Sequence, residues 1–74
     1  MKLHYDPEVD ALYLRLGDAK IVQSEEVRPG VVLDFDAQDR VVGVEILDVK
    51  KRFPEADVKR LQLEVAPASS ASER

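Results

Sequence analysis

The sequence contains neither cysteine nor tryptophan and has a single histidine among its 74 residues. The absence of cysteine excludes a disulfide framework, a thiolate nucleophile and a zinc–thiolate site. Long apolar runs are also missing, since Val31 to Leu33 falls far short of the roughly 20 residues that cross a bilayer. The N-terminal residues lack the apolar core of a signal peptide. We therefore expect a cytoplasmic protein with no membrane partner.

Charge and length further limit the kinds of protein that this chain can be. Charged residues make up 35% of the chain and give a formal net charge of −4, and an acidic protein repels the phosphates of nucleic acids and anionic membranes. The hydrophobic content of 45% is too high for a disordered chain. A chain of 74 residues forms one domain that buries only about 60% of its unfolded surface. Its stability should therefore be marginal.

Alternation of apolar and polar residues predicts a β-rich fold. Five segments carry the pattern: Lys2 to Tyr5, Ala11 to Leu16, Ile21 to Val27, Val31 to Phe35 and Val41 to Leu47. The turns between them include Asp6-Pro7-Glu8, a predicted tight reversal at Gly17-Asp18-Ala19, and Arg28-Pro29-Gly30 with the Pro and Gly positions of a type II turn. The third segment is the most polar, so we expect it at an edge of the sheet.

Both faces of the predicted sheet carry apolar residues. One face holds the expected core set, which is Leu12, Leu14, Val42, Val44 and Ile46. The opposite face holds Tyr13, Val32, Val41 and Leu47. Because one short helix covers only one face of a sheet, we expect a second copy of the chain to cover the other face in a homodimer.

The character of the sequence changes after Asp48, where a helix is predicted with Asp48 as its N-cap and a break or kink at Pro54. Leu61 to Val65 alternates again, which fits a last strand better than continued helix. The predicted fold is α+β, an antiparallel meander of five or six strands with one short helix after the fifth. Residues 1–65 form the domain, and residues 66–74 form a disordered tail.

The order of these turns and strands resembles a known family. The matching residues are Tyr5-Asp6-Pro7, Asp10 to Leu14, Ser24 to Val27, Pro29-Gly30-Val31, Asp34 with Asp36, and Val41 to Leu47. They are similar to the small bacterial and archaeal domain-of-unknown-function family 2283, over roughly residues 2–53. That family has no established activity, cofactor or catalytic residue, so the resemblance implies a fold and leaves the function open.

Acidic residues form the first candidate site. Six of them lie in or beside two turns: Asp6, Glu8 and Asp10, and then Asp34, Asp36 and Asp39. The first turn alternates like a calcium loop, but Pro7 and the missing Gly and distal Glu depart from the EF-hand pattern. The second turn would join it only if both met at one end of the sheet. We predict turn-forming carboxylates and no metal site.

Three further residues are candidates for acid–base or nucleophilic chemistry: His4, Ser24 and Glu45. A His/Ser/Asp triad needs its members within hydrogen-bond reach, and nothing in the sequence orders Ser24 or gives His4 a partner. Glu45 lies on a central strand, where burial would raise its pKa. We favour an ion pair with Arg15 or Arg28 across the sheet. The sequence thus predicts no catalytic residue and no cofactor.

The basic residues cluster in one segment, which holds Lys50, Lys51, Arg52, Lys59 and Arg60. Nucleic-acid binding needs several phosphate contacts, and the chain lacks a stacking platform of aromatic residues, a helix-turn-helix pattern and a glycine-rich phosphate loop. We therefore expect these residues to be a solvated helix face.

These patterns predict a small non-enzymatic interaction or regulatory module that forms a homodimer and leaves room for an unidentified protein partner. Two alternatives stay open. One is an antitoxin-like acidic binder of a basic partner protein, which copurification of such a partner would favour. The other is a carboxylate-based hydrolase at a dimer cleft, which converging Asp or Glu side chains would favour.

Overall fold

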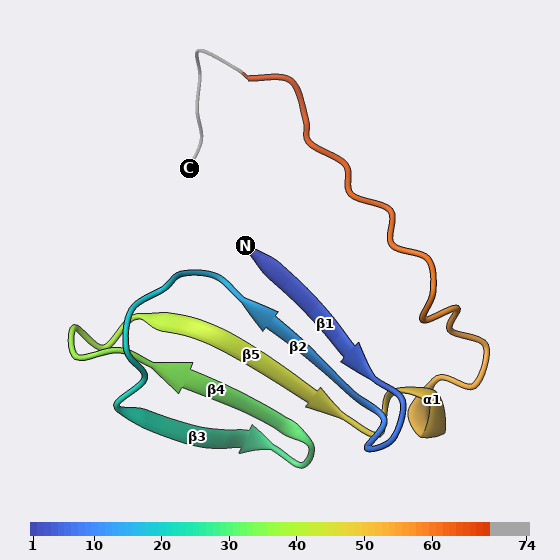
Figure 1. Ribbon diagram of the computed structural model, residues 1–74, viewed down its shortest axis with the longest axis horizontal. Helices are drawn as coiled ribbons and strands as arrows, with labels where there is room; N and C mark the ends of the chain where they lie inside the picture. The colour runs from blue at the N-terminus through green and yellow to red at the C-terminus, as the bar shows by residue number, and fades with distance from the viewer. Residues whose placement is uncertain (69–74) are drawn as a thin grey trace.

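The computed structural model describes residues 1–68 and contains five strands and one short helix (Figure 1). The strands are β1 (Lys2–Asp6), β2 (Ala11–Arg15), β3 (Gln23–Arg28), β4 (Val31–Phe35) and β5 (Val41–Leu47), and the helix is α1 (Val49–Arg52). The predicted α+β class, with one short helix after the fifth strand, is confirmed. Within residues 1–68, no helix is long and apolar enough to cross a membrane.

The five strands form one antiparallel sheet in the order β1-β2-β5-β4-β3. Residues 16–22 therefore cross the end of the sheet from β2 to β3, past β5 and β4 (Figure 1). The predicted tight reversal at Gly17 is wrong, because β2 and β3 are not neighbours and Gly17 has no positive φ. Strands β2 to β5 have the order of a Greek key, which leaves β1 and β3 at the two edges.

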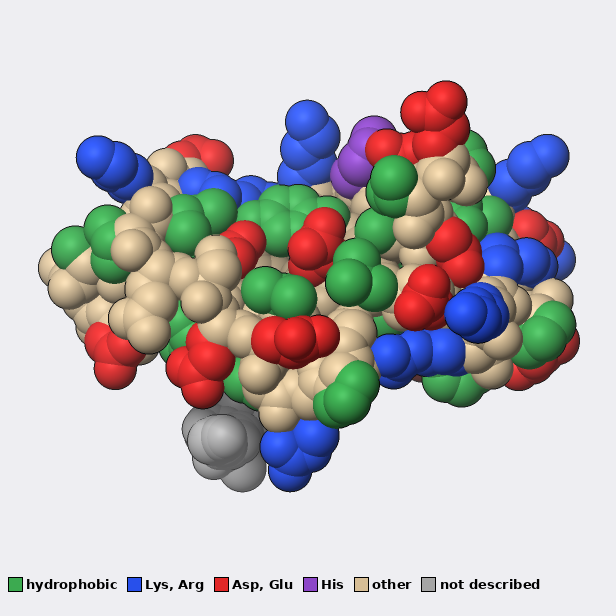
Figure 2. Space-filling model, turned by 90° about the horizontal axis from the view of Figure 1, so that it is seen from below, with side chains coloured by type: hydrophobic (Ala, Val, Ile, Leu, Met, Phe, Trp, Pro, Cys, Tyr) green, Lys and Arg blue, Asp and Glu red, His purple; other side chains and the backbone are tan. Residues whose placement is uncertain are grey.

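The edge position predicted for the third strand is confirmed in β3. Glu25 and Glu26 are exposed, and the pairing with β4 shifts register between Glu26 and Arg28. Figure 2, seen from the side on which β3 lies in Figure 1, shows acidic side chains among hydrophobic ones. The turn that ends β3 has Gly30 at φ 81°, as a type II turn requires. Charge and irregular pairing protect this edge from another strand.

The strand registers separate two faces of the sheet. What we call the apolar face contains two cross-strand rows, Leu3-Leu14-Val44-Leu33 and Tyr5-Leu12-Ile46-Val31. What we call the polar face contains the rows His4-Tyr13-Glu45-Val32-Glu26 and Lys2-Arg15-Gly43-Asp34-Ser24. Four members of the expected core set, Leu12, Leu14, Val44 and Ile46, therefore share one face. Tyr13 and Val32, which were expected to face a second copy, lie on a face that is largely polar.

Helix α1 covers little of the apolar face. It has four residues and lies beyond the end of the sheet, beside the turn between β1 and β2 (Figure 1). The apolar side chains that are buried in the described chain are Ala11, Val42 and Val49, and the rest of the expected core, Leu12, Leu14, Val44 and Ile46, is half-buried. The expectation that the helix covers this face was wrong, because the helix ends at Arg52, before Pro54.

Residues 53–68 continue without strand or helix. The apolar side chains of Leu61, Leu63 and Val65 are 71%, 77% and 83% exposed. The predicted sixth strand is therefore absent from the single chain. Of the predicted tail, residues 66–68 have neither strand nor helix, and residues 69–74 lie outside the described residues.

Deleting residues 66–74 should leave the melting temperature unchanged within error. Among these residues only alanine and one proline are apolar, and their burial cannot offset a backbone ordering cost of about 1–2 kcal/mol per residue. Thermal unfolding of the two chains at equal concentration measures this. A drop of several degrees would place the domain boundary later than residue 65.

Candidate functional site

The most connected side chains of the polar face are Tyr13, Asp34 and Ser24. Tyr13 Oη donates a hydrogen bond to Asp34 Oδ2 at 2.7 Å, and Ser24 Oγ donates one to Asp34 Oδ1 at 2.6 Å. The Tyr13 side chain passes over Gly43 of β5, where a Cβ would clash with Oη and lie 2.9 Å from Cζ. The absence of a side chain at residue 43 therefore permits a network from β2 to β3.

This network leaves no group ready for acid–base chemistry. Both oxygens of Asp34 already accept a hydrogen bond. Burial, followed by the hydrogen bond to Asp34, raises the pKa of Tyr13, so that its hydroxyl remains a protonated donor near neutral pH. The network joins strands, and it is a structural feature that sequence patterns missed because the contact between Tyr13 and Asp34 depends on strand order.

The two members of a possible triad lie far apart. His4 is on β1 at one edge of the sheet, and Ser24 is on β3 at the other. Four strand spacings separate them, or about 19 Å. No hydrogen bond can join the two side chains across that distance.

Glu45 does not form the predicted ion pair. Its neighbours in the register are Tyr13 and Val32. The guanidinium of Arg15 donates to the carbonyls of Gly17 and Ala19, and that of Arg28 donates to the Val27 carbonyl. The prediction was wrong because both arginines bind backbone oxygens close in sequence. Within the described residues, an ion pair joins Arg40 Nε to Asp36 Oδ2 at 2.9 Å.

The two acidic turns do not converge. Asp6 to Asp10 lies at the end of β1 beside α1, and the turn after β4 lies at the opposite end of the sheet (Figure 1). Asp36 is only 4% exposed and accepts hydrogen bonds from the backbone N–H groups of Gln38 and Arg40 and from Arg40 Nε. The backbone bond from Arg40 is the largest cause of a lowered Asp36 pKa. These carboxylates hold turns.

Asp10 has a role that the sequence did not reveal. Its carboxylate accepts hydrogen bonds from the backbone N–H groups of Lys50 at 2.9 Å and Lys51 at 3.2 Å, and from Tyr5 Oη at 2.6 Å. It thus caps α1 from the β1–β2 turn. The predicted cap, Asp48, makes no side-chain cap bond because its backbone is left-handed, at φ 58°. Residues 10 and 50 are too distant in sequence for a local motif to connect them.

The contacts of Asp10 shift two pKa values in opposite directions. The bond from Tyr5, followed by those from the α1 backbone, lowers the pKa of Asp10. The same bond is the main cause that raises the pKa of Tyr5 to about 12, with burial and nearby carboxylates adding to it. The charged form of Asp10 therefore stabilises the fold through these hydrogen bonds.

Divalent metals should not stabilise the fold. Asp6, Asp10, Asp34 and Asp36 all accept hydrogen bonds from the protein, and no group of metal-ligating side chains gathers within the described part of the chain. A metal at a hundredfold excess over its Kd would add about 2.7 kcal/mol of stability. Melting with calcium, magnesium, manganese or zinc against a chelator control measures this. A metal-specific rise that Asp6→Asn or Asp10→Asn removes would contradict the prediction.

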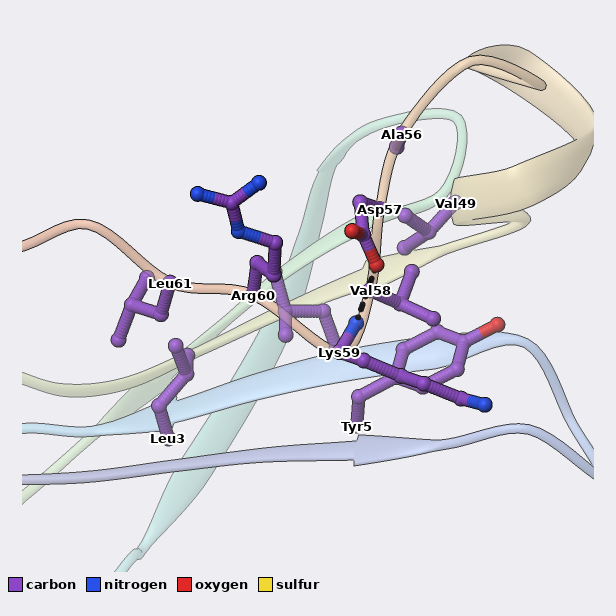
Figure 3. Close-up of a pocket in the computed structure, with 10 residues that line it drawn as sticks. Leu3, Tyr5, Val49, Ala56, Asp57, Val58, Lys59, Arg60 and Leu61 are labelled. Carbon is purple, nitrogen blue, oxygen red and sulfur yellow. Dashed lines mark hydrogen bonds between the residues drawn. The ribbon is translucent and has the colours of Figure 1, made fainter.

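The basic segment holds the chain after α1. Lys50 Nζ donates to the carbonyls of Pro54 at 3.0 Å and Ala56 at 2.6 Å, and the guanidinium of Arg52 donates to the Pro29 carbonyl. Two of its cations therefore bind the protein's own backbone. Beyond them, residues 56–61 pass over the apolar face at β1 and form a groove with Leu3, Tyr5, Leu12 and Val49 (Figure 3).

The remainder of the apolar face is the surface most suited to binding. Leu14, Leu33 and Val44 form adjacent positions of one cross-strand row, and all three are half-buried. Neither α1 nor residues 56–61 line a groove with them in the described structure. A contiguous apolar surface on a small soluble domain marks a binding site more often than isolated exposed residues do.

Comparison with known proteins identifies the family and no closer relative. A family model described as "Protein of unknown function (DUF2283)" matches residues 2–50. No curated protein matches the chain, and no solved structure does. The matched residues contain the complete sheet, both faces and the Asp10 cap with the first residues of α1. On the strength of that match, the chain belongs to the DUF2283 family of proteins of unknown function.

Proposed function

We propose that this protein is a non-enzymatic interaction module that binds a second copy of itself through the apolar face. The observation that carries the proposal is the apolar face itself, in which two cross-strand rows of apolar side chains have no layer of residues 1–68 packed over their centre. Domains are normally built from two packed layers around a core. A second sheet would provide the missing layer.

The accessible surface supports this assignment. A compact folded chain of 8.3 kDa exposes about 4,600 Å², and this chain exposes 6144 Å². Residues 53–68, which lie without strand or helix and are mostly exposed, contribute to the excess of about 1,500 Å². A standard interface removes about 800 Å² from each partner, so the chain has enough unburied surface for a dimer. Two copies of one face form a closed two-fold pair.

Light scattering over a wide range of concentration tests the proposal. We expect a mass of twice 8.3 kDa at micromolar concentration and dissociation on dilution. The melting temperature should rise with protein concentration, because association stabilises the folded state by mass action. A mass near 8.3 kDa at every concentration would contradict the proposed dimer.

Two neighbouring residues of β4 provide matched variants. Leu33 lies on the apolar face and Val32 on the polar face, and both are half-buried. Leu33→Asp should abolish the dimer and Val32→Asp should preserve it, because a buried unpaired carboxylate disrupts only the interface that contains it. Leu33→Ala serves if the Asp variant does not fold. Loss of the dimer in Val32→Asp alone would place the interface on the polar face.

A regulatory role, an antitoxin-like role and a carboxylate-based hydrolase remain finer alternatives. The exposed acidic residues of β3 suit a basic partner, and copurification of such a protein would favour the antitoxin-like role. Hydrolysis would need two carboxylates across a cleft. We favour the homodimeric module because the apolar face supports it without requiring a second kind of protein or a catalytic cleft.

A further inference from the structure

The outer edge of β1 is open in the described chain. β1 pairs with β2 on one side and has no neighbouring strand on the other. The opposite edge, β3, carries exposed acidic residues and a register shift. An additional strand therefore fits β1 better than β3.

The C-terminal segment has the sequence of a strand that lacks a neighbour. Leu61, Leu63 and Val65 alternate with Gln62 and Glu64. The three apolar side chains are more than two-thirds exposed, at 71%, 77% and 83%. Period-two alternation is the pattern of a strand with one buried face, and here that face is not buried by the single chain.

One antiparallel register between this segment and β1 matches both faces of the sheet. It places Leu63 opposite Leu3. The apolar pairs are then Leu61–Tyr5, Leu63–Leu3 and Val65–Met1, and the charged pairs are Arg60–Asp6 and Glu64–Lys2. The apolar pairs extend the apolar face, and both charged pairs have opposite signs, which stabilises facing strands.

The parallel direction fails this test. In parallel, matching Leu61 to Leu3 sets Arg60 opposite Lys2 and Glu64 opposite Asp6, and matching Leu63 to Leu3 sets Gln62 opposite Lys2 and Glu64 opposite His4, so neither register has the two Lys/Arg–Asp/Glu pairs of the antiparallel one. Like charges directly opposite each other destabilise a sheet. The charges of the two segments therefore favour the antiparallel direction, which has two pairs of opposite sign.

The chain's own segment does not occupy this position. Leu61 and Leu3 point toward one another across the groove over β1 (Figure 3), whereas the matched register needs Leu63 at that place. Within the described residues, no backbone hydrogen bond joins residues 56–65 to β1. The segment lies over the sheet and is out of register by two residues.

We propose that residues 60–65 of one copy add as a sixth strand to the free edge of β1 in a second copy, and that the exchange is reciprocal. This inference rests on the proposed homodimer. Residues 53–59 connect the segment to α1 and span up to about 23 Å when extended, against about 10 Å between packed sheets. Two turns must open. The first is closed by the bond from Ala56 N–H to Phe53 O and by Lys50 Nζ on the Pro54 and Ala56 carbonyls. The second is closed by the bonds from Arg60 N–H to Asp57 O and from Lys59 N–H to Asp57 Oδ1. Reciprocal exchange is a low-cost route to a closed dimer.

Disulfide trapping tests the exchange cleanly because the chain has no cysteine. Chains carrying Leu3→Cys alone and Leu63→Cys alone are mixed and oxidised, so that a bond between positions 3 and 63 can form only between molecules. The pair His4→Cys with Gln62→Cys samples the adjacent register position, since neighbouring pairs differ in Cα separation. Leu3→Cys with Gln62→Cys is the control, because those side chains point to opposite faces. Peptide mass spectrometry identifies each bond.

We expect the in-register bonds to form several-fold more than the control bond. Both substitutions in one chain should give a covalent dimer on a denaturing gel. An intramolecular bond instead would show that the segment pairs with its own β1, and equal yields in register and control would show no pairing; either result overturns the exchange. Neither result affects the homodimer if light scattering still finds twice the monomer mass, whereas a monomer at all concentrations overturns both proposals.

Truncation gives an independent measurement. A chain that ends at Arg60 should dimerise with a Kd at least about tenfold higher than a chain that ends at Val65, because it loses three apolar side chains from the interface. The chain that ends at Val65 keeps the proposed strand and is the matched control. Equal Kd values for the two chains would overturn the exchange.

Discussion

Asp10→Asn should lower the melting temperature by about 4–8 °C at neutral pH, the shift expected when a small domain loses a helix cap. Asparagine tolerates the left-handed backbone that Asp10 adopts at φ 56°, so the variant removes the charge and leaves the turn. The lost interactions are the charged acceptor for the N–H groups of Lys50 and Lys51 and for Tyr5 Oη. Thermal unfolding at fixed protein concentration measures the change.

The same variant should flatten the pH profile of stability at both ends. The folded pKa of Asp10 is lowered from 3.8, so its contribution is present above pH 3.8 and is lost as pH falls through the folded value. The folded pKa of Tyr5 is raised from 10.0 to about 12, so its contribution is present below pH 10.0 and is lost as pH rises toward 12. Asp36 also has a lowered pKa, so the Asp10→Asn variant should still lose part of its stability at acid pH.

Asp39→Asn is the matched control for Asp10. Asp39 also has a positive φ, at 64°, and lies in an exposed turn, but its carboxylate accepts no hydrogen bond within residues 1–68. Its melting temperature and pH profile should match those of the unmodified chain. Equal losses in the two variants would contradict the assignment of Asp10 as the cap of α1.

Gly43→Ala should destabilise the fold by about 1–3 kcal/mol, the usual cost of overpacking a well-filled site. The new Cβ would clash with Tyr13 Oη and lie 2.9 Å from its Cζ and 3.0 Å from Asp34 Oδ2. Residue 43 is buried between its neighbours on β5, so the backbone has little freedom to move away. The hydrogen bond from Tyr13 to Asp34 should break, and chemical denaturation measures the loss.

Gly17→Ala is the control for Gly43. A Cβ at residue 17 meets no atom within 4 Å, and the residue has no positive φ. It should be neutral or should stabilise slightly through the unfolded state. The cost of Gly43→Ala should shrink in a Tyr13→Phe background, because the closest atom is then absent. A full cost in that background would show that Tyr13 is not the obstacle.

Local sequence patterns were sufficient to predict the strands and much of the turn chemistry. The alternation in Val31 to Phe35 and Val41 to Leu47 placed these strands at their observed bounds, because side-chain direction in a strand depends only on sequence spacing. Pro29 and Gly30 specified a type II turn, because their φ preferences act within a single residue. The polarity of β3 indicated its edge position for the same local reason.

The tertiary structure decided everything that depends on which strands are neighbours. The position of β5 beside β2 sets Gly43 next to Tyr13 and Asp34, and no spacing in the sequence encodes that contact. The long-range bond from Lys50 to Asp10 moved the cap away from Asp48. The same strand order separated the two acidic turns and left Glu45 without its predicted partner. Sequence alone therefore determined the elements and their apolar faces, and packing determined which parts of those faces residues 1–68 leave uncovered, because burial is a property of the folded chain and not of any segment.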